Sequence, residues 1–346
     1  MTQLPETRAA LAAWYEIYKR DLPWRRTRDP YAIWISEIML QQTRVAAVIP
    51  YYERFLTLYT TVDALAQAPE PELLAAWAGL GYYSRARNLQ AAAKMIVALG
   101  AFPRDHATLR TLPGIGDYTA AAVASIAFDL PHAVVDGNVV RVLARFSAES
   151  GDISQSVTKS RLRLAADQFL DPAQSSRHNQ AVMELGATVC TPRAPQCGKC
   201  PLANGCQAHE KGLAHQLPIR SRKTVIRRVE RSLLVVIRNG NILLWQRPPE
   251  KAILAGFWEL PEPHQLPSAK TGGALHHFKH SITDHIYTFH VFEATVRRAP
   301  ATLKWISPDR LSILPLSTTT RKALAGIDPV VNFLPGNKFL ARNRVD

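Results

Sequence analysis

The chain has 346 residues, 47% of them hydrophobic and 20% charged, which fits a folded protein of two or three domains and excludes a disordered one. No apolar run reaches the roughly 18 residues of a membrane helix, and residues 1–13 lack the apolar core of a signal peptide, so we expect a cytoplasmic protein. The net charge is +14, and residues 211–346 carry 21 Lys and Arg against 9 Asp and Glu, a balance that suits binding to nucleic acid or, equally, a solvated basic surface.

The first two thirds of the chain predict an all-helical body. Hydrophobic residues recur at helical spacing from Thr7 to about Leu213, and turn residues separate the stretches. Strand-like alternation is scarce there, so we assign residues 1–215 to one helical domain. Its clearest helices are expected over 33–42, 45–58, 86–99, 117–128 and 139–148.

Two carboxylates of this body are candidates for acid–base chemistry. Glu37 stands among apolar residues, and burial there would raise its pKa toward that of a usable general acid. Asp136 precedes a predicted helix. Each has an ordinary structural explanation, Glu37 as an acid near the helix N-terminus and Asp136 as an N-cap. Two carboxylates in different environments are, however, what cleavage of a glycosidic bond requires.

Between these acids lies a glycine-rich turn. The segment Leu112-Pro-Gly-Ile-Gly116 comes directly before the helix expected over 117–128. Glycines at a helix N-terminus let backbone amides approach a phosphate oxygen closely. This is the pattern of a helix-hairpin-helix motif, which holds DNA without reading its sequence; a plain turn between two helices is the alternative.

All four cysteines stand within one short segment and are spaced C-x6-C-x2-C-x5-C. Clustered thiols in a long chain indicate a metal site rather than a disulfide framework. The compact, uneven spacing favours one 4Fe–4S cluster over the paired C-x2-C knuckles of a zinc ribbon, and structural zinc stays open as the alternative. The cysteines are Cys190, Cys197, Cys200 and Cys206.

The pattern changes after the helical body. Residues 216–231 are rich in Lys and Arg and predict a basic interdomain linker. Two β-rich runs, 232–238 and 241–247, then flank Asn239-Gly240, which indicates a hairpin because both turn residues tolerate positive φ. We therefore expect a C-terminal α+β domain over 232–346. Its later strands are expected over 286–296 and 303–306.

Taken in chain order, these motifs resemble the adenine DNA glycosylases of the helix-hairpin-helix superfamily, the MutY family. The resemblance is dense from about residue 20 to 210 and looser beyond. It implies a multidomain protein with an all-α glycosylase body, built from a six-helix barrel module and an iron–sulfur module, and a C-terminal Nudix-like domain. The residues that carry it are Ser36-Glu37-Ile-Met-Leu-Gln-Gln-Thr43, Gly79-Leu-Gly-Tyr-Tyr83, Leu112-Pro-Gly-Ile-Gly116, Val135-Asp-Gly-Asn138 and the four cysteines.

The resemblance implies a monofunctional base excision repair enzyme that removes adenine mispaired with 8-oxoguanine or guanine in duplex DNA. Glu37 would protonate adenine N7, and Asp136 would stabilise the oxocarbenium-like sugar, either electrostatically or through a transient covalent adduct. Tyr118 and Asn138 would support these two acids. The adenine must first leave the base stack.

The same resemblance assigns residues to base and DNA binding. Gln42 and Tyr82 would wedge into the duplex beside the partner base, and the amides of Gly114 and Gly116 would hold phosphates. For Trp24, as for Tyr82, simple core packing is the alternative. The remaining residues assigned to this group are Arg25, Thr43 and Glu184.

The C-terminal domain resembles the Nudix-like domain with which this family contacts 8-oxoguanine. When the pattern of active Nudix hydrolases is counted from Gly256, Glu262 fits, but Ala274 and Leu275 stand where the paired metal-binding acids belong. We therefore expect no pyrophosphate hydrolysis. The family's lesion-reading loop is Phe-Ser-His, and lysine in place of serine here predicts stronger phosphate attraction. The matching residues are Phe278, Lys279 and His280.

Two other functions remain as alternatives. Endonuclease III, a pyrimidine-lesion glycosylase and lyase, resembles this chain but carries a nucleophilic lysine where Tyr118 stands, and without an amine no Schiff base can form. A non-catalytic iron–sulfur DNA-binding protein would not need both Glu37 and Asp136. We expect a monomer that binds double-stranded DNA, makes no membrane contact and is associated with the nucleoid of a bacterial-type cell when bound.

Overall fold

The computed structural model describes residues 4–221, 225–248, 254–282 and 284–327. Among these residues, no helix combines the length and the apolar character needed to span a bilayer. The chain divides into two compact units, the first formed by Met1–Gln67 and Asn88–Lys223 and the second by Ala68–Arg87 and Thr224–Asp346. A short helical segment of the N-terminal half therefore groups with the C-terminal unit.

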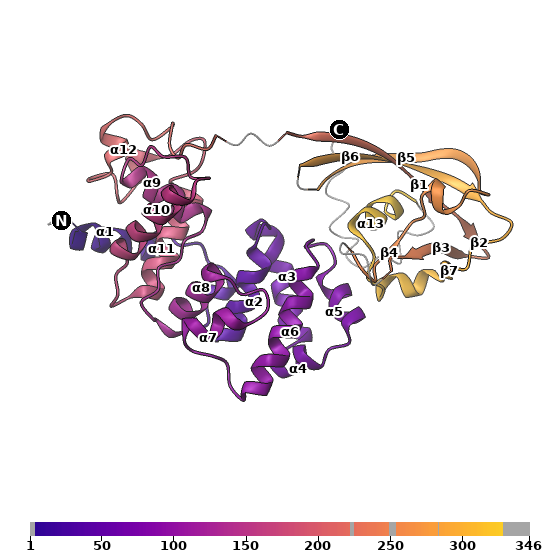
Figure 1. Ribbon diagram of the computed structural model, residues 1–346, viewed down its shortest axis with the longest axis horizontal. Helices are drawn as coiled ribbons and strands as arrows, with labels where there is room; N and C mark the ends of the chain where they lie inside the picture. Colours follow the sequence, from indigo (N-terminus) through magenta and orange to yellow (C-terminus); the bar gives the residue numbers. More distant parts are fainter. Residues whose placement is uncertain (1–3, 222–224, 249–253, 283, 328–346) are drawn as a thin grey trace. The chain divides into compact units, whose positions relative to one another are not determined.

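The first unit is all-helical, as predicted (Figure 1). The helices expected over 45–58 and 117–128 form with these bounds, as α3 and α8. The elements are α1 (Leu4–Tyr18), η1 (Pro23–Arg25), α2 (Pro30–Leu40), α3 (Val45–Leu58), α4 (Val62–Gln67), most of α6 (Ser84–Leu99), α7 (His106–Thr111), α8 (Asp117–Phe128), α9 (Gly137–Phe146), α10 (Ser156–Phe169), α11 (Ser175–Thr188), η2 (Cys197–Lys199) and α12 (Gln207–Glu210).

Helix α2 is the central helix of this unit. Asp29 caps its N-terminus by accepting hydrogen bonds from the amides of Tyr31 and Ala32, and Pro30 occupies the first turn. Every residue from Tyr31 to Met39 is buried, so the helix has no solvated face. A carboxylate on this helix is therefore removed from water wherever it points.

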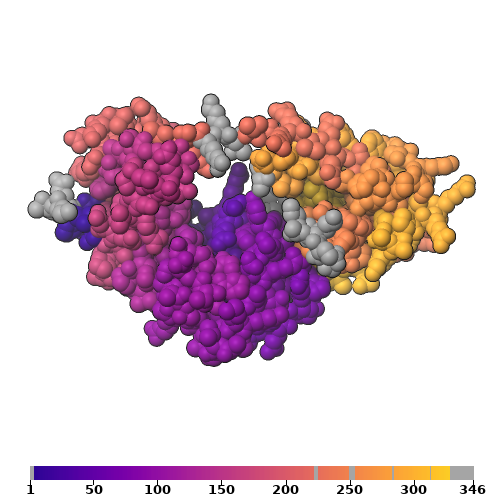
Figure 2. Space-filling model, in the orientation of Figure 1, coloured from indigo at the N-terminus to yellow at the C-terminus, as the bar shows by residue number. Residues whose placement is uncertain are grey.

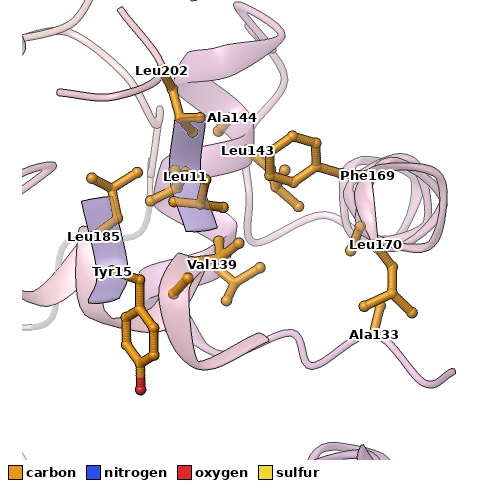
Figure 3. Packing of buried hydrophobic residues seen from close by; sticks show 14 of the residues in the cluster. Leu11, Tyr15, Ala133, Val139, Leu143, Ala144, Phe169, Leu170, Leu185 and Leu202 are labelled. Atoms are coloured by element: carbon orange, nitrogen blue, oxygen red, sulfur yellow. The ribbon is translucent and has the colours of Figure 1, made fainter. Parts of the chain in front are cut away.

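Helices α1, α9, α10 and α11 surround one hydrophobic core (Figure 3). Leu11 of α1, Leu143 of α9 and Leu185 of α11 are among its members and are at most 2% exposed. Burial of one such side chain contributes roughly 1.5–3 kcal/mol. This packing fixes the position of α9, and with it the residue that begins the helix.

The second unit contains two sheets and a few helices, which form one closely packed body (Figure 2). In the first sheet β6 lies between β1, which runs parallel to it, and β5, which is antiparallel. In the second sheet β3 pairs with β2, β4 and β7. The elements are α5 (Glu70–Trp77), β1 (Arg227–Val235), β2 (Ile237–Arg238), β3 (Asn241–Gln246), β4 (Trp258–Glu259), η3 (Pro263–Gln265), β5 (Lys270–Ile282), β6 (His285–Thr295), β7 (Leu303–Ile306), η4 (Pro308–Ser312) and α13 (Thr318–Leu324).

The predicted hairpin is present. Asn239 and Gly240 adopt φ of 49° and 75° and connect the antiparallel strands β2 and β3. The strand expected over 303–306 forms with these bounds as β7. Three expectations differ from the structure. The run expected as one hairpin strand over 232–238 is divided between the end of β1, which pairs with β6, and the two-residue strand β2. Strand β1 begins at Arg227, inside the segment predicted as a linker, and the long strand β5 was not anticipated.

Candidate active site

One cavity of the first unit brings together the residues predicted to act on the base. Its volume is about 400 Å³, and its walls come from η1, α2, α11 and the N-terminal ends of α8 and α9. This volume is sufficient for a small organic group such as a purine base. The predicted residues that line it are Trp24, Arg25, Glu37, Gln42, Thr43, Tyr118, Asp136, Asn138 and Glu184.

Glu37 is a buried acid at the wall of this cavity. Its side chain belongs to α2, and the residue is only 3% exposed. The Tyr118 hydroxyl donates a 2.6 Å hydrogen bond to its Oε2. Burial raises the pKa of Glu37 to about 7, with Tyr118 opposing the increase and the nearby Asp136 adding to it. Near neutral pH this carboxyl therefore has a substantial protonated fraction and can act as an acid.

Asp136 lines the same cavity as the N-cap of α9. Its Oδ1 accepts the Val139 amide at 2.7 Å, and its Oδ2 accepts the Asn138 side-chain amide at 2.8 Å. Burial raises the pKa of Asp136 above its ordinary value, although these two donors stabilise the charged form. The explanation of Asp136 as an N-cap is thus confirmed, and the same side chain lines the cavity.

Asn138 is itself held in place. Its Oδ1 accepts a 2.8 Å hydrogen bond from Arg141, whose guanidinium also donates to the carbonyls of Cys190 and Gly186. A Cβ atom on Gly186 would lie 2.6 Å from the Asn138 Cβ. The absence of a side chain at residue 186 therefore gives Asn138 its space.

Glu184 is a buried ionic anchor. It accepts hydrogen bonds from Arg20 at 2.7 Å and from Arg25 at 2.8 Å. Burial alone would raise the pKa of Glu184, but the two arginines lower it to about 2, so the group stays ionised. The carboxylate thereby fixes Arg25 in the cavity wall. Trp24, which is 7% exposed, packs edge-on against Tyr52 and thus also serves the core.

The far end of α2 leads into the predicted wedge. Gln42 is exposed and has a φ of 59°, a left-handed conformation that is uncommon outside glycine. The neighbouring Gln41 donates to the Thr119 hydroxyl, and the Thr43 hydroxyl donates to the Gln41 carbonyl. Backbone strain held by surrounding contacts is found more often at functional sites than elsewhere.

The glycine turn lies at the N-terminus of α8. Gly114 has a φ of 77°, and a Cβ atom there would lie 2.8 Å from the Asn88 Cβ, so only glycine fits. Gly116 is the N-cap of α8, the helix whose second residue is Tyr118. Neither glycine lines the cavity. The turn directly precedes the N-terminus of α8, the end of a helix at which backbone amides can bind an anion.

A broad groove continues from the mouth of the cavity. It has a volume of about 1550 Å³ and shares Tyr118, Asp136 and Asn138 with the cavity. Apart from Asp136, Asp117 is the only acidic residue in the described part of the chain that lines this groove, so basic residues outnumber acidic ones there. The basic residues that line it are Arg141, Lys159, Arg163, His215 and Arg220. We call this surface the basic groove.

The four cysteines line one small hollow beside Arg145. Arg145 is 2% exposed, and it donates to the Cys190 sulfur at 3.2 Å and to the Thr191 carbonyl at 2.8 Å. Burial raises the pKa of Cys200 to about 12, while the Leu202 amide donates to its sulfur. Four thiols that line one hollow are the donor set of an iron–sulfur cluster and equally of structural zinc.

Tyr82 lies in the second unit, so its position relative to the cavity is not assigned. It is 46% exposed and has a φ of 48°. Core packing, the alternative considered for it, therefore does not describe this side chain. The next residue, Tyr83, is buried and packs on Phe257 at a ring distance of 4.0 Å.

The segment predicted as a lesion-reading loop is a strand. Phe278, Lys279 and His280 belong to β5 and pair with β6. The Phe278 ring stacks on Phe289 at 5.2 Å, and Lys279 is exposed on the opposite face. His280 approaches Lys322 of α13, and burial together with this lysine lowers its pKa. The expectation of a loop was wrong. The segment is a strand because it pairs with β6, which comes later in the chain, and its own residues do not reveal that pairing.

The single acid that matched the Nudix hydrolase pattern has a structural role. Glu262 caps η3 and forms an ion pair with Arg231 at 2.5 Å. It is thus engaged by a cation from β1.

Sequence reasoning missed Arg20, Arg141 and Gly186. Arg20 and Gly186 each contact a predicted site residue that is distant in the chain, Glu184 and Asn138 respectively, whereas Arg141 contacts Asn138 within one helix and is itself held by the distant carbonyls of Gly186 and Cys190. No local pattern marks such positions. For the two arginines, the only signal in the sequence was the large number of arginines in the helical part of the chain, where positive and negative charges nearly balance.

Three family models match the chain. Residues 35–167 match the HhH-GPD superfamily of base excision DNA repair proteins, residues 190–206 match the iron–sulfur binding domain of endonuclease III, and residues 232–326 match the NUDIX domain. The second match agrees with the hollow between the four cysteines and decides against zinc. The chain therefore carries a 4Fe–4S cluster in the segment 190–206, which contains all four cysteines.

Solved structures support the fold of the helical unit. A thermostable thymine-DNA glycosylase is 31% identical with a TM-score of 0.55, and the match covers 61% of this chain and 98% of that one. A non-covalent endonuclease III–DNA complex is 26% identical with a TM-score of 0.51, over 62% of this chain and 99% of that one.

Curated relatives decide the family. The adenine DNA glycosylase of Mus musculus is 36% identical over 91% of this chain and 76% of its own length. That of Homo sapiens is 48% identical over 61% of this chain and 40% of its own length, and that of Buchnera aphidicola subsp. Schizaphis graminum is 34% identical over 72% of each. With its helix-hairpin-helix body, its cluster loop and its Nudix-like domain, the chain belongs to the adenine DNA glycosylase family.

Proposed function

We propose that this glycosylase excises adenine opposite 8-oxoguanine or guanine, with Glu37 as general acid and Asp136 as the anion that faces the sugar. The single observation that carries the proposal is that these two carboxylates line one purine-sized cavity and that each has a raised pKa. An acid that is protonated near neutrality beside a capped, hydrogen-bonded carboxylate gives the two different roles that glycosidic cleavage needs.

The proposed reaction conserves protons and electrons. Glu37 transfers its proton to adenine N7, the electrons of the glycosidic bond pass to the base, and adenine leaves as a neutral molecule. Asp136 balances the positive charge on the sugar, and a water molecule then adds to C1′ and returns a proton to Glu37. Tyr118 orients Glu37 through its 2.6 Å hydrogen bond, and Asn138 orients Asp136 through its 2.8 Å bond.

Arg25 and Trp24 form the wall against which the extruded base would pack. The guanidinium of Arg25 is held by Glu184, so it presents a fixed donor to the ring nitrogens of a purine. Extrusion costs a few kcal/mol, less at a mismatch. Thr43 lies at the rim of the cavity beside Gln42.

DNA contacts are proposed at four surfaces. The amides of Gly114 and Gly116 bind phosphates, the basic groove holds the continuing strand, and Gln42 and Tyr82 enter the duplex beside the partner base. In the second unit, exposed Lys279 is available to the DNA backbone and His280 to the lesion, whereas Phe278 must leave its stack on Phe289 to insert.

We propose the same domain organisation that the sequence indicates: a glycosylase domain over 1–215, a basic connection over 216–231 and a lesion-recognition domain over 232–346, in a monomer that works on the nucleoid. The bound 4Fe–4S cluster supplies a covalent crosslink for the loop 190–206. Arg145 packs against that loop, and Arg141 connects it to Asn138.

The decisive experiment is single-turnover excision on duplexes that carry adenine opposite 8-oxoguanine, guanine or thymine. We expect release of adenine from the first two and not from the third. A borohydride trapping reaction on a further duplex that carries a damaged pyrimidine should give no protein–DNA adduct, whereas an endonuclease III-like lyase would be trapped. Release of a damaged pyrimidine without release of adenine would overturn the proposal.

A further inference from the structure

The turn between α5 and α6 carries Tyr82 in a strained backbone. Gly79, Gly81 and Tyr82 have φ of 115°, 71° and 48°, so three of four consecutive residues are left-handed. Glycine adopts this conformation freely, but tyrosine does not. Tyr82 therefore needs outside contacts to stay where it is, and its side chain nevertheless remains 46% exposed.

Arg85 provides those contacts from the first turn of α6. Its Nη2 donates to the carbonyl of Leu80 at 3.0 Å and to the carbonyl of Gly81 at 3.1 Å. The Gly81 carbonyl also accepts the Trp77 indole N–H at 3.3 Å. The carbonyls of the two residues that directly precede Tyr82 are thus fixed by one guanidinium.

The guanidinium of Arg85 also contacts two aromatic rings. Its Cζ lies 5.5 Å from the centre of the Trp77 ring and 5.7 Å from the centre of the Tyr82 ring. Both distances are within the range of cation–π attraction. Trp77 is fully buried and belongs to α5, so the arginine connects the exposed Tyr82 ring to an immobile one.

We propose that Arg85 is the positioning residue of the wedge: it holds Tyr82 in its strained, outward conformation before DNA arrives. This rests on the proposed function of Tyr82. A wedge that is already ordered does not lose conformational freedom on binding, which increases affinity for the distorted duplex. Arg85 does not itself contact the reacting atoms.

Lysine cannot replace this arginine. One edge of the planar Arg85 guanidinium donates to both carbonyls while its face lies on the aromatic rings. An ammonium group is not planar and cannot make both kinds of contact. The next arginine of the same helix, Arg87, makes an ion pair with Glu70 and donates to the Ala255 carbonyl instead. Arg87 carries the same charge on the same helix, but its side chain is engaged by Glu70 and Ala255 rather than by the turn, so Arg87 is a matched control.

The test uses the full chain and a duplex with a tetrahydrofuran abasic analogue opposite 8-oxoguanine and 2-aminopurine as the neighbouring base. Binding should unstack 2-aminopurine and increase its fluorescence. We expect Y82A, R85Q and R85K each to lose most of this increase and to bind about tenfold more weakly, because charge-assisted hydrogen bonds and cation–π contacts are lost. R87Q should retain the increase, and thermal unfolding of each variant controls for folding.

The double variant Y82A/R85Q separates the possible outcomes. If Arg85 acts through Tyr82, the double variant binds no more weakly than Y82A. Additive losses, or a full fluorescence increase in R85Q, would overturn the inference while the wedge role of Tyr82 stands. An unchanged increase in Y82A would instead show that the wedge proposal itself is wrong, and the inference would end with it.

Discussion

The Tyr118 hydroxyl donates a 2.6 Å hydrogen bond to Glu37 Oε2 and joins the helix-hairpin-helix segment to the central helix of the body. Tyr118 is the second residue of α8, directly after the glycine turn proposed to bind phosphates. This hydrogen bond therefore ties the position of the proposed acid to the position of that turn.

Glu37→Gln should abolish excision and leave DNA binding nearly unchanged. Glutamine keeps the shape of the side chain but has no acidic proton, and general acid catalysis contributes about 10²–10⁴-fold in rate. The measurement is single-turnover release of adenine from the 8-oxoguanine mispair, with affinity measured on the abasic duplex. Glu53→Gln, an exposed glutamate of α3, is the control. Full excision by E37Q would remove Glu37 from the mechanism.

The excision rate should fall as pH rises through about 7. The pKa of Glu37 is raised to about 7, mainly by burial, and only the protonated form donates a proton, so the rate should decrease about tenfold per pH unit well above that value. Because the folded pKa exceeds the unfolded one, the free energy of unfolding should also fall as pH rises from about 4.5 to 7. A single-turnover rate independent of pH between 6 and 9 would contradict this assignment.

Tyr118→Phe should move the alkaline limb of that profile to higher pH. The Tyr118 hydrogen bond lowers the pKa of Glu37, so its removal lets burial raise the pKa further. The rate at the optimum should also fall, because the carboxyl loses its orienting donor. Tyr51→Phe on α3 serves as the control. If the limb stays in place or moves to lower pH, Tyr118 does not tune the acid in the proposed way.

Lys159→Gln combined with Arg163→Gln should weaken DNA binding in a salt-dependent way. Both side chains line the basic groove from α10. Each phosphate contact adds about 0.9 to the slope of log affinity against log salt, so the double variant should flatten that slope by about 1.8. Lys94→Gln removes an exposed charge of α6 outside the groove and should leave the slope unchanged. Equal slopes for all three proteins would exclude the groove as a DNA contact.

The helices of the first unit could be predicted because each is encoded by residues that are close together in the sequence. Apolar residues at helical spacing define α3 and α8 to the residue, and Asp136 could be identified as a cap from the helix that follows it. The motif residues of the cavity came from the family resemblance, and the cavity places nine of them together.

The remainder depends on contacts between distant segments. Strand β5 contains His, Lys and Gly, is largely exposed, and exists through its pairing with β6, so no alternation of apolar and polar residues reveals it. The start of β1 is likewise a row of exposed residues paired with β6. Arg20 and Glu184 are joined by three hydrogen bonds across 164 positions of sequence, a relationship that only the fold creates.

Asp136 both caps α9 and lines the cavity. A substitution there can separate the stability of the fold from activity, two properties that mutations usually change together. Asparagine caps helices about as well as aspartate, so a protein with Asp136→Asn can keep its melting temperature and still lack the anion that the sugar needs. A screen of variants by cellular abundance or thermal shift would classify such an enzyme as normally stable. At this residue only a chemical assay distinguishes a working protein from an inert one.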